Sequence, residues 1–366
     1  MGFKSVRFAS YRNIEDGAVE TGAVSVFLIG ENGQGKTNFI DAIYTLCYGS
    51  SFRGGKDGEA ARLGVDAWQV AGITGSDGPG SWLDALDERV AVSWNGGIKA
   101  IHADDKPVRD RKHLIERNPA VLFCHDDLSF ANGEPERRRF FFDQTAGLVS
   151  TGYIDLLRTY RHVLKARNAA LKDRRFDILD ILDIQLATSG LPLLEQRARL
   201  VSDFNRTFPG RYESVSQLGR GVSVEYRPSW GLDADLDSIG RILAGARQRE
   251  AAFGTTLSGP HRDRFTFTDG LGDYSLRAST GQLRLLALTL RISQAEHFAA
   301  MTGRKPILLL DDVLLELDPA RRRRFMDNLP VYRQAFFTFL PGEPYGDYRS
   351  GDTIVYWTEH GRFSRS

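Results

Sequence analysis

The stretch GENGQGKTN, residues 30–38, directly follows the apolar run VSVFLI at residues 24–29. Its spacing, G-x-x-x-x-G-K-T from Gly30 to Thr37, is typical of a phosphate-binding loop between a strand and a helix. Glycines let backbone N–H groups converge on phosphates, and the N-terminus of the following helix adds a favourable dipole. Considered alone, the stretch also fits a glycine turn before a helix. Its flanking strand and helix patterns favour a site for a nucleotide triphosphate.

Two side chains of this loop have expected roles of their own. Lys36 reaches the terminal phosphates and is expected to act in catalysis, and Thr37 supplies a hydroxyl to Mg²⁺. The expected nucleotide-binding residues of the loop are Gly30, Glu31, Asn32, Gly33, Gln34, Gly35, Lys36, Thr37 and Asn38.

A carboxylate partner for the metal comes from KPILLLDDVLLELD, residues 305–318. An apolar strand there ends in two aspartates. Asp311 at the strand tip is placed to hold Mg²⁺ through water, and Asp312 to polarise the attacking water. The alternative is a plain apolar strand followed by two solvated aspartates.

Between these motifs, ASTGQL at residues 278–283 precedes a clear helix. Ser279, Gly281 and Gln282 form a second phosphate-binding corner at a helix N-terminus. One nucleotide has no need of two such corners unless the second one serves the γ-phosphate bound by another copy of the chain. Considered alone, the corner also fits an ordinary helix cap. In this order it resembles the signature motif of ABC-type ATPases, with LELD at residues 315–318 as the loop that follows.

Further segments narrow the resemblance to the RecF family, the SMC-like recombination and repair ATPases, and they span almost the whole chain. They are YRN at residues 11–13, GENGQGKTNFIDAIYTL at 30–46, SFR at 51–53, EPERRRFFFD at 134–143, SGPHRD at 258–263 and LLLDDVLLELD at 308–318.

This resemblance implies an ATP-dependent homodimer that clamps DNA at junctions of single and double strands in recombinational repair and replication. It implies binding of double-stranded and gapped DNA, weak DNA-stimulated ATP hydrolysis, and work with RecR and RecO to load RecA at gaps. Arg12 and Asp318 are expected to join the nucleotide site. The implied fold is an α/β, ABC-type ATPase head made from residues 1–110 and 255–366. A mainly helical lobe, residues 111–254, is inserted between them.

Composition sets limits on how DNA is bound. The 366 residues include 48 Lys plus Arg and 47 Asp plus Glu, so DNA must be met by local clusters rather than by net charge. The proposed DNA contacts are Arg53, Arg137, Arg138 and Arg139. Each basic cluster also fits a solvated helix face. No pattern for reading base edges is seen, so we expect little sequence preference.

The compartment is predicted from what the sequence contains. Cys47 and Cys124 are too few for a disulfide framework and are expected to be buried thiols. No signal peptide or membrane-spanning run is found, so a cytoplasmic protein without a membrane partner is expected.

Secondary structure follows from the same periodicities. Strands are expected at residues 4–9, 18–20, 24–29, 264–268, 274–276, 307–310, 335–339 and 353–357. Helices are expected at residues 38–48, 153–175, 178–204 with an interruption at TSGLP, 236–253 and 285–298.

Two other functions share the phosphate loop. A small-molecule kinase would not need the STGQ corner and would act as a monomer. An interaction scaffold would use ATP to control assembly, with little need for hydrolysis.

Overall fold

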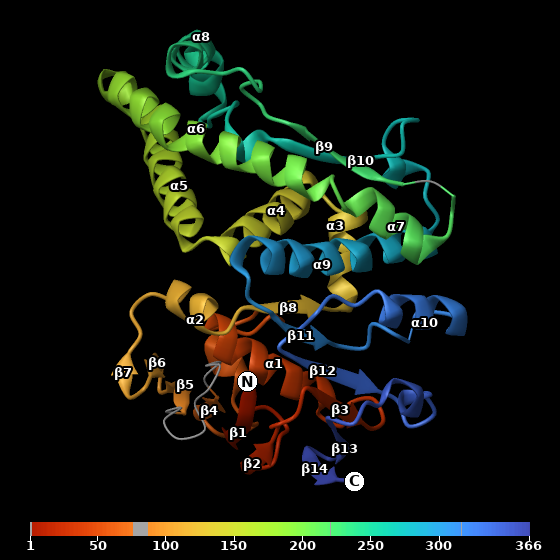
Figure 1. Ribbon diagram of the computed structural model, residues 1–366. Coiled ribbons are helices and arrows are strands. Elements are labelled where there is room, and N and C mark those ends of the chain that lie inside the picture. The colour runs from red at the N-terminus through yellow and green to blue at the C-terminus, as the bar shows by residue number, and fades with distance from the viewer. Residues whose placement is uncertain (1, 76–86, 220, 316) are drawn as a thin grey trace. The chain divides into compact units, whose positions relative to one another are not determined.

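The computed structural model describes residues 2–75, 87–219, 221–315 and 317–366 (Figure 1). The chain forms two compact units: unit 1 is Met1–His125 with Phe298–Ser366, and unit 2 is Asp126–His297. Unit 1 therefore combines both ends of the chain, and unit 2 is the segment inserted between them.

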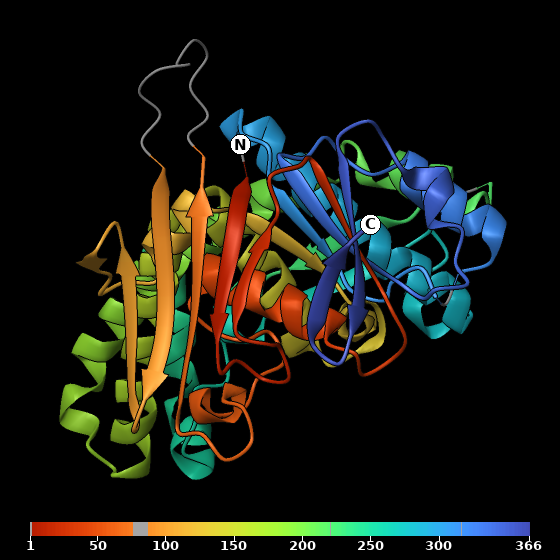
Figure 2. The same cartoon turned by 90° about the horizontal axis from the view of Figure 1, so that it is seen from below.

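Unit 1 contains a six-stranded sheet in which every neighbouring pair is antiparallel. Alternate residues of its strands are buried, as expected for a sheet with one face on a core. Its red and orange strands lie side by side in Figure 2. In spatial order they are β2 (Gly17–Glu20), β1 (Phe3–Ala9), β4 (Ala67–Thr74), β5 (Glu88–Asn95), β6 (Ile98–Ala103) and β7 (Lys106–Pro107).

A second six-stranded sheet of unit 1 carries the two motifs of the expected nucleotide site. It is parallel except for β14 at one edge. Strands β3 and β11 are buried along their whole length, in keeping with their apolar runs VFLI and ILLL. In order they are β14 (Arg362–Arg365), β13 (Thr353–Glu359), β3 (Ser25–Ile29), β12 (Gln334–Phe339), β11 (Ile307–Leu310) and β8 (Ala120–Phe123).

Helix α1 (Lys36–Tyr48) contacts strands of both sheets. Phe39, Ile40, Ile43 and Leu46 on this helix are fully buried in the core of the unit. Cys47 and Cys124 are both buried, as predicted for the thiols. The other helical segments of this part of the chain are η1 (Asp57–Ala60), α2 (Lys112–Arg117), η2 (His125–Asp127), α10 (Pro319–Asp327) and η6 (Tyr345–Tyr348).

Unit 2 is mainly helical with one antiparallel strand pair, β9 (Ser223–Arg227) and β10 (Arg264–Thr268). Its helical segments are α3 (Leu128–Asn132), α4 (Pro135–Val149), α5 (Thr151–Lys172), η3 (Phe176–Ile178), α6 (Leu179–Phe204), α7 (Phe208–Ser216), α8 (Leu236–Phe253), η4 (Pro260–Arg262) and η5 (Tyr274–Leu276). Helix α9 (Thr280–Thr302) begins in this unit.

Two expected elements differ in the structure. Helix α6 continues through TSGLP with Pro192 inside it, and Gly190 is needed because a Cβ there would lie 2.5 Å from the Trp230 ring. Residues 274–276 form a 3₁₀ turn, η5, rather than a strand, because Asp273 caps it by accepting from the Ser275 N–H.

The residue boundaries of the two compact units also differ from those of the predicted head and lobe. Residues 111–125 group with unit 1 because β8 pairs with β11. Residues 255–297 group with unit 2, where β10 pairs with β9. The assignment of a head to residues 1–110 and 255–366 stays a prediction. Among the described residues, none of the helices has the length and apolar character needed to cross a membrane.

Candidate nucleotide site

The phosphate loop connects β3 to α1, as the sequence predicts. Gly33 has φ 78° and Gly35 has φ 118°, a backbone region that favours glycine. Lys36 is only 3% exposed, and its Nζ donates to the carbonyl oxygens of Gly30 at 2.7 Å and Glu31 at 3.0 Å. The ammonium is thus held inside the loop, where terminal phosphates would bind.

Thr37 and Asp311 meet at the ends of β3 and β11, which are separated by one strand. The Thr37 hydroxyl donates to Asp311 Oδ1 at 2.9 Å, although the two residues are far apart in sequence. Burial, and then the charge of Asp312, raise the pKa of Asp311 to about 7. A hydroxyl and a carboxylate are the oxygen ligands that Mg²⁺ takes beside phosphate oxygens, so the pair fits this metal. In the described part of the chain, no group of three or more His, Cys, Asp or Glu side chains could hold a metal ion by itself.

Asp312 is held by Thr338, a residue that sequence reasoning missed. Asp312 has φ 53°, which is uncommon for a residue with a side chain. Its N–H donates to Thr338 Oγ1 at 2.8 Å, and that hydroxyl donates to Asp312 Oδ1 at 3.0 Å. A threonine inside the aromatic strand QAFFTF was the available signal. Thr338 fixes both the backbone and one carboxylate oxygen of Asp312.

A cavity of about 210 Å³ lies at this site. Arg53 faces it, and its Nη1 donates to Asn38 Oδ1 at 2.8 Å. The expected DNA contact Arg53 therefore lies in the phosphate-loop cavity. The cavity is lined by Asn32, Gly33, Gly35, Lys36, Thr37, Asn38, Arg53 and Asp312.

Other residues of the expected nucleotide site differ in their surroundings. Gln34 Oε1 accepts from the His360 N–H at 2.7 Å, and Glu31 is exposed. Arg12, with φ 48°, forms an ion pair with buried Asp41 at 2.8 Å. Asp41 was also missed by sequence reasoning, although its position in the apolar face of α1 marks it.

Known proteins are similar to this chain over almost its whole length. The chain is 40% identical over 354 residues to "DNA replication and repair protein RecF" of Treponema pallidum (strain Nichols), covering 96% of this chain and 98% of that protein. It is 28% identical over 373 residues to the protein of the same name from Trichlorobacter lovleyi, covering 100% and 98%. The chain belongs to the RecF family. No family model matches it.

Solved structures show the same fold for this RecF-family chain. A structure described as the recombination mediator protein RecF-ATP in the RecFOR pathway superposes with a TM-score of 0.88 at 24% identity, covering 100% of this chain and 97% of that one. An Smc head bound to the C-winged helix domain of ScpA gives a TM-score of 0.61 at 13% identity, with 100% and 97% coverage. The predicted ABC-type head fold, shared with SMC heads, is confirmed.

The second corner of the RecF-family sequence lies in unit 2, whereas the phosphate loop lies in unit 1. The Ser279 N–H donates to Gln282 Oε1 at 2.8 Å, and the Gln282 N–H donates to Ser279 Oγ at 3.3 Å. This reciprocal pair caps α9. Ser279 and Gly281 are exposed at its start. The corner is thus a formed helix N-terminus that is open to a ligand.

Asp318 is the N-cap of α10, since its Oδ1 accepts from the Arg321 N–H at 2.9 Å. This backbone hydrogen bond lowers the pKa of Asp318. Glu316, in the same LELD segment, lies outside the described residues.

The three adjacent arginines of α4 have different surroundings. Arg138 is 11% exposed and donates to the carbonyl oxygens of Phe265 and Ala131 and to Ser275 Oγ. These contacts argue against a DNA contact by Arg138. Arg137 is exposed, and Arg139 is half-buried.

Proposed function

We propose that this chain is an ATP-dependent DNA-binding protein of replication and recombinational repair. The single observation that carries the proposal is the cluster of Lys36, Thr37, Asp311 and Asp312 at the carboxyl ends of the parallel strands β3 and β11. It is supported by membership of the RecF family and by the name of the curated relatives. RecF-ATP is also the state named for the similar solved structure.

In this proposal, each residue of the cluster has one role. Lys36 binds the terminal phosphates of ATP, and Thr37 with Asp311 would hold Mg²⁺, which supplies charge neutralisation at those phosphates. Asp312 orients the water that attacks the γ-phosphorus as the bond to the β-phosphate oxygen breaks. Because the Asp312 side chain is one methylene shorter than that of a glutamate base, we expect slow hydrolysis.

The proposed active form is an ATP-dependent homodimer in the cytoplasm. Ser279, Gly281 and Gln282 of each copy complete the phosphate site of the other, and Arg12 and Asp318 join that site. The dimer acts as a clamp on double-stranded and gapped DNA, and DNA stimulates hydrolysis. RecR with RecO, and through them RecA, are the proposed partners in loading at gaps. An ATP-controlled scaffold is the alternative, and it differs in not needing hydrolysis.

Nucleotide binding tests this proposal directly. Replacing Lys36 by Ala removes the only ammonium proposed to contact the phosphates, so ATP affinity should fall by roughly ten- to a hundredfold, the effect of a hydrogen bond to a charged group. A fluorescent ATP analogue measures it. The matched control is Lys305→Ala, an exposed lysine of the same unit, which should bind like the unsubstituted chain. Equal affinity for both variants would overturn the phosphate-site assignment.

A further inference from the structure

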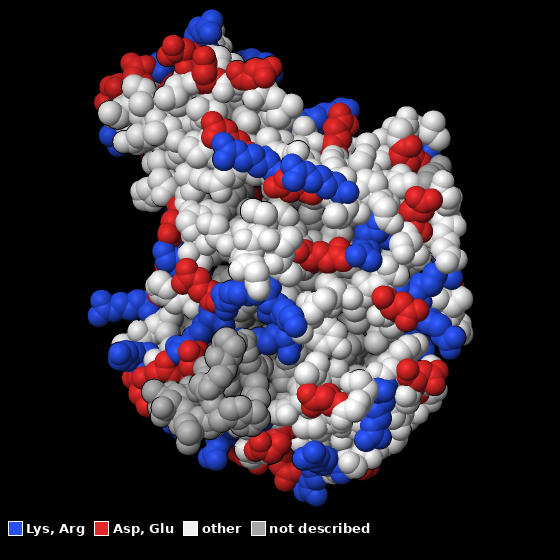
Figure 3. All heavy atoms as spheres, viewed as in Figure 1, with Lys and Arg blue, Asp and Glu red and all other residues white. Residues whose placement is uncertain are grey.

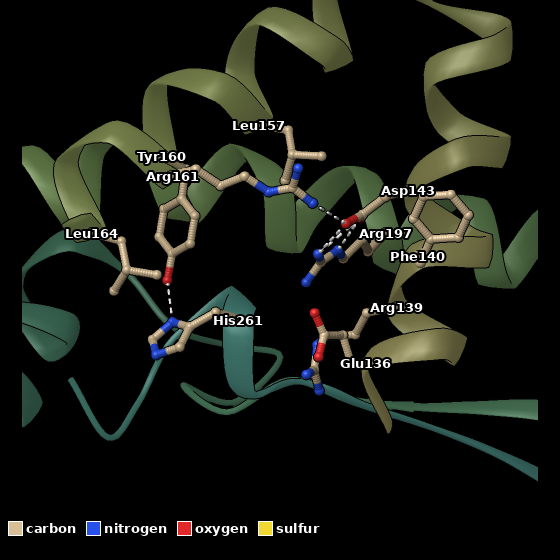
Figure 4. Close-up of a pocket in the computed structure, with 10 residues that line it drawn as sticks. All are labelled: Glu136, Arg139, Phe140, Asp143, Leu157, Tyr160, Arg161, Leu164, Arg197 and His261. Atoms are coloured by element: carbon tan, nitrogen blue, oxygen red, sulfur yellow. Dashed lines mark hydrogen bonds and ion pairs between the residues drawn. The ribbon is translucent and has the colours of Figure 1, made fainter. Parts of the chain in front are cut away.

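Unit 2 contains a second cavity, separate from the nucleotide site. Its volume is about 210 Å³, and it lies between α4, α5, α6 and η4. Figure 4 shows polar groups of α4 and α6 on one side and the Tyr160–His261 pair on the other. Phe140 is 48% exposed and Arg161 63%, so the cavity is reached from the surface. Its lining consists of Glu136, Arg139, Phe140, Asp143, Leu157, Tyr160, Arg161, Leu164, Arg197 and His261.

Several polar groups of this cavity are already satisfied. Arg197 Nη2 binds both carboxylate oxygens of Asp143, and its Nη1 donates to Asp263 Oδ2 at 2.7 Å. His261 Nε2 lies 3.0 Å from Thr256 O, and its Nδ1 lies 2.7 Å from the Tyr160 hydroxyl. A neutral imidazole that donates to the carbonyl and accepts from the hydroxyl fits both contacts. Burial lowers the pKa of His261 to about 4. These groups therefore line the cavity, and their hydrogen bonds are made within the protein rather than to a ligand.

Two groups on the same face of α4 remain available. Arg139 has five N–H donors, and in the described chain it uses one, from Nη1 to the Asp263 carbonyl at 3.0 Å. The side chain of Glu136, three residues earlier, makes no hydrogen bond or ion pair with any described residue. Burial, and then the charge of Arg197, lower the pKa of Arg139. The cavity therefore offers unused donors from Arg139 and unused acceptors from Glu136.

This pairing selects a class of ligand. A phosphate or a carboxylate offers only acceptors and would meet the Glu136 carboxylate. The cluster also has no excess positive charge, because Arg139, Arg161 and Arg197 are matched by three carboxylates, those of Glu136, Asp143 and Asp263. A nucleobase offers donors and acceptors in one plane without a charge. An Arg fork suits the O6 and N7 acceptors of guanine.

Size and wall chemistry agree with a base. An engineered apolar cavity of about 150 Å³ holds benzene, so about 210 Å³ is room for a heterocycle. Phe140 offers an aromatic face at the entrance, and Leu157 and Leu164 offer apolar walls. Unpaired bases are bound by such aromatic and guanidinium surfaces. We propose that this cavity binds one unpaired nucleobase of single-stranded DNA, a proposal that rests on the proposed function of DNA binding.

The test compares two single-stranded oligonucleotides of equal length, one intact and one with abasic residues that keep every phosphate. With ATP present, the full chain should bind the intact strand roughly tenfold more tightly, the scale of one stacked base. Arg139→Gln removes the fork and Leu164→Trp fills the cavity, and each should bring the two affinities together. Circular dichroism checks that the variants fold, and either variant alone suffices if the other does not.

The control is Arg137→Gln, the exposed neighbour that does not line the cavity. It should weaken both strands equally and keep their ratio. Equal binding of intact and abasic strands by the unsubstituted chain would overturn the base site while leaving DNA binding intact. A ratio that stays unchanged in both cavity variants would overturn it as well. A chain that binds neither single strands nor duplex would overturn the proposed function itself.

Discussion

At the scale of single residues, the Thr338–Asp312 contact is the part of the candidate site that depends on tertiary structure. The two residues are joined through neighbouring strands β11 and β12. The sequence indicates both aspartates because they follow an apolar run, but it does not reveal which side chain holds Asp312. Thr338 is a positioning residue in the proposed hydrolysis, since it acts through Asp312.

Replacing Thr338 by Val should slow ATP hydrolysis roughly tenfold, because Asp312 loses a hydrogen bond to a charged group and its backbone N–H loses its acceptor. ATP affinity should stay unchanged, since Lys36 and Thr37 keep their contacts. Single-turnover hydrolysis and nucleotide binding are measured separately. Thr338→Ser keeps the hydroxyl and should restore the rate.

The Asp312→Asn variant gives the reference for this prediction. If Thr338 acts through Asp312, adding Thr338→Val to Asp312→Asn should cause little further loss, because coupled residues are not additive. Two losses that multiply would contradict the positioning role.

At the scale of elements, the predictions succeeded where a strand or helix is decided by its own apolar pattern. Strand β11 and helix α8 have the predicted limits, 307–310 and 236–253. The strand AVLF at residues 120–123 was missed because it is short and its partner β11 lies far along the chain. Likewise, the packing of Gly190 on Trp230, which accompanies the unbroken α6, cannot be read from local propensity.

The buried network around α6 makes an element-scale prediction. Arg197 is 2% exposed, and although burial disfavours its charge, Asp143 holds the pKa of Arg197 above its ordinary value. Arg197→Met would remove the only close cation of buried Asp143 and Asp263 among the described residues and leave Asp143 only its 3.9 Å ion pair with exposed Arg161, which should lower the free energy of unfolding of unit 2 by about 3–5 kcal/mol. Hydrogen exchange of the α6 amides, followed by mass spectrometry, reports it.

Arg199→Met is the control in the same helix, because Arg199 is exposed and its ion pair with Glu195 is 3.9 Å long. This variant should change the exchange free energy by no more than about 0.5 kcal/mol. Similar exchange for the two variants would contradict a stabilising role of the buried network.

At the scale of the whole molecule, the composition carries no net basic character that would mark a DNA-binding surface. Positive and negative side chains are interspersed on the face drawn in Figure 3, in keeping with the formal net charge of +1. A clamp made by two copies would present each local cluster twice, so it could bind the DNA backbone without a basic composition. The arrangement of the copies, rather than the charge of one chain, is the feature to be tested.

The proposed composite site predicts complementation between two inactive variants. Lys36→Ala lacks the loop function, and Ser279→Arg places a bulky side chain at the exposed corner where the partner's γ-phosphate would lie. Each should be inactive alone, and Ser279→Arg should still bind ATP through its own loop without dimerising. If each chain had a self-contained site, Ser279→Arg would remove only the hydrogen bond that caps α9, at a cost of about 1 kcal/mol of stability. In the mixed dimer, the loop of the Ser279→Arg chain meets the corner of the Lys36→Ala chain, so one site is intact. Hydrolysis should therefore return, to about half the unsubstituted rate per dimer if the two sites are independent. Heterodimers isolated with two tags provide the measurement.

The matched control pairs an unsubstituted chain with one carrying both changes. That dimer has the same two substitutions, but each of its sites contains one of them, so it should stay inactive. Equal activity of the two heterodimers, or normal hydrolysis by monomeric Ser279→Arg, would rule out a site shared between copies.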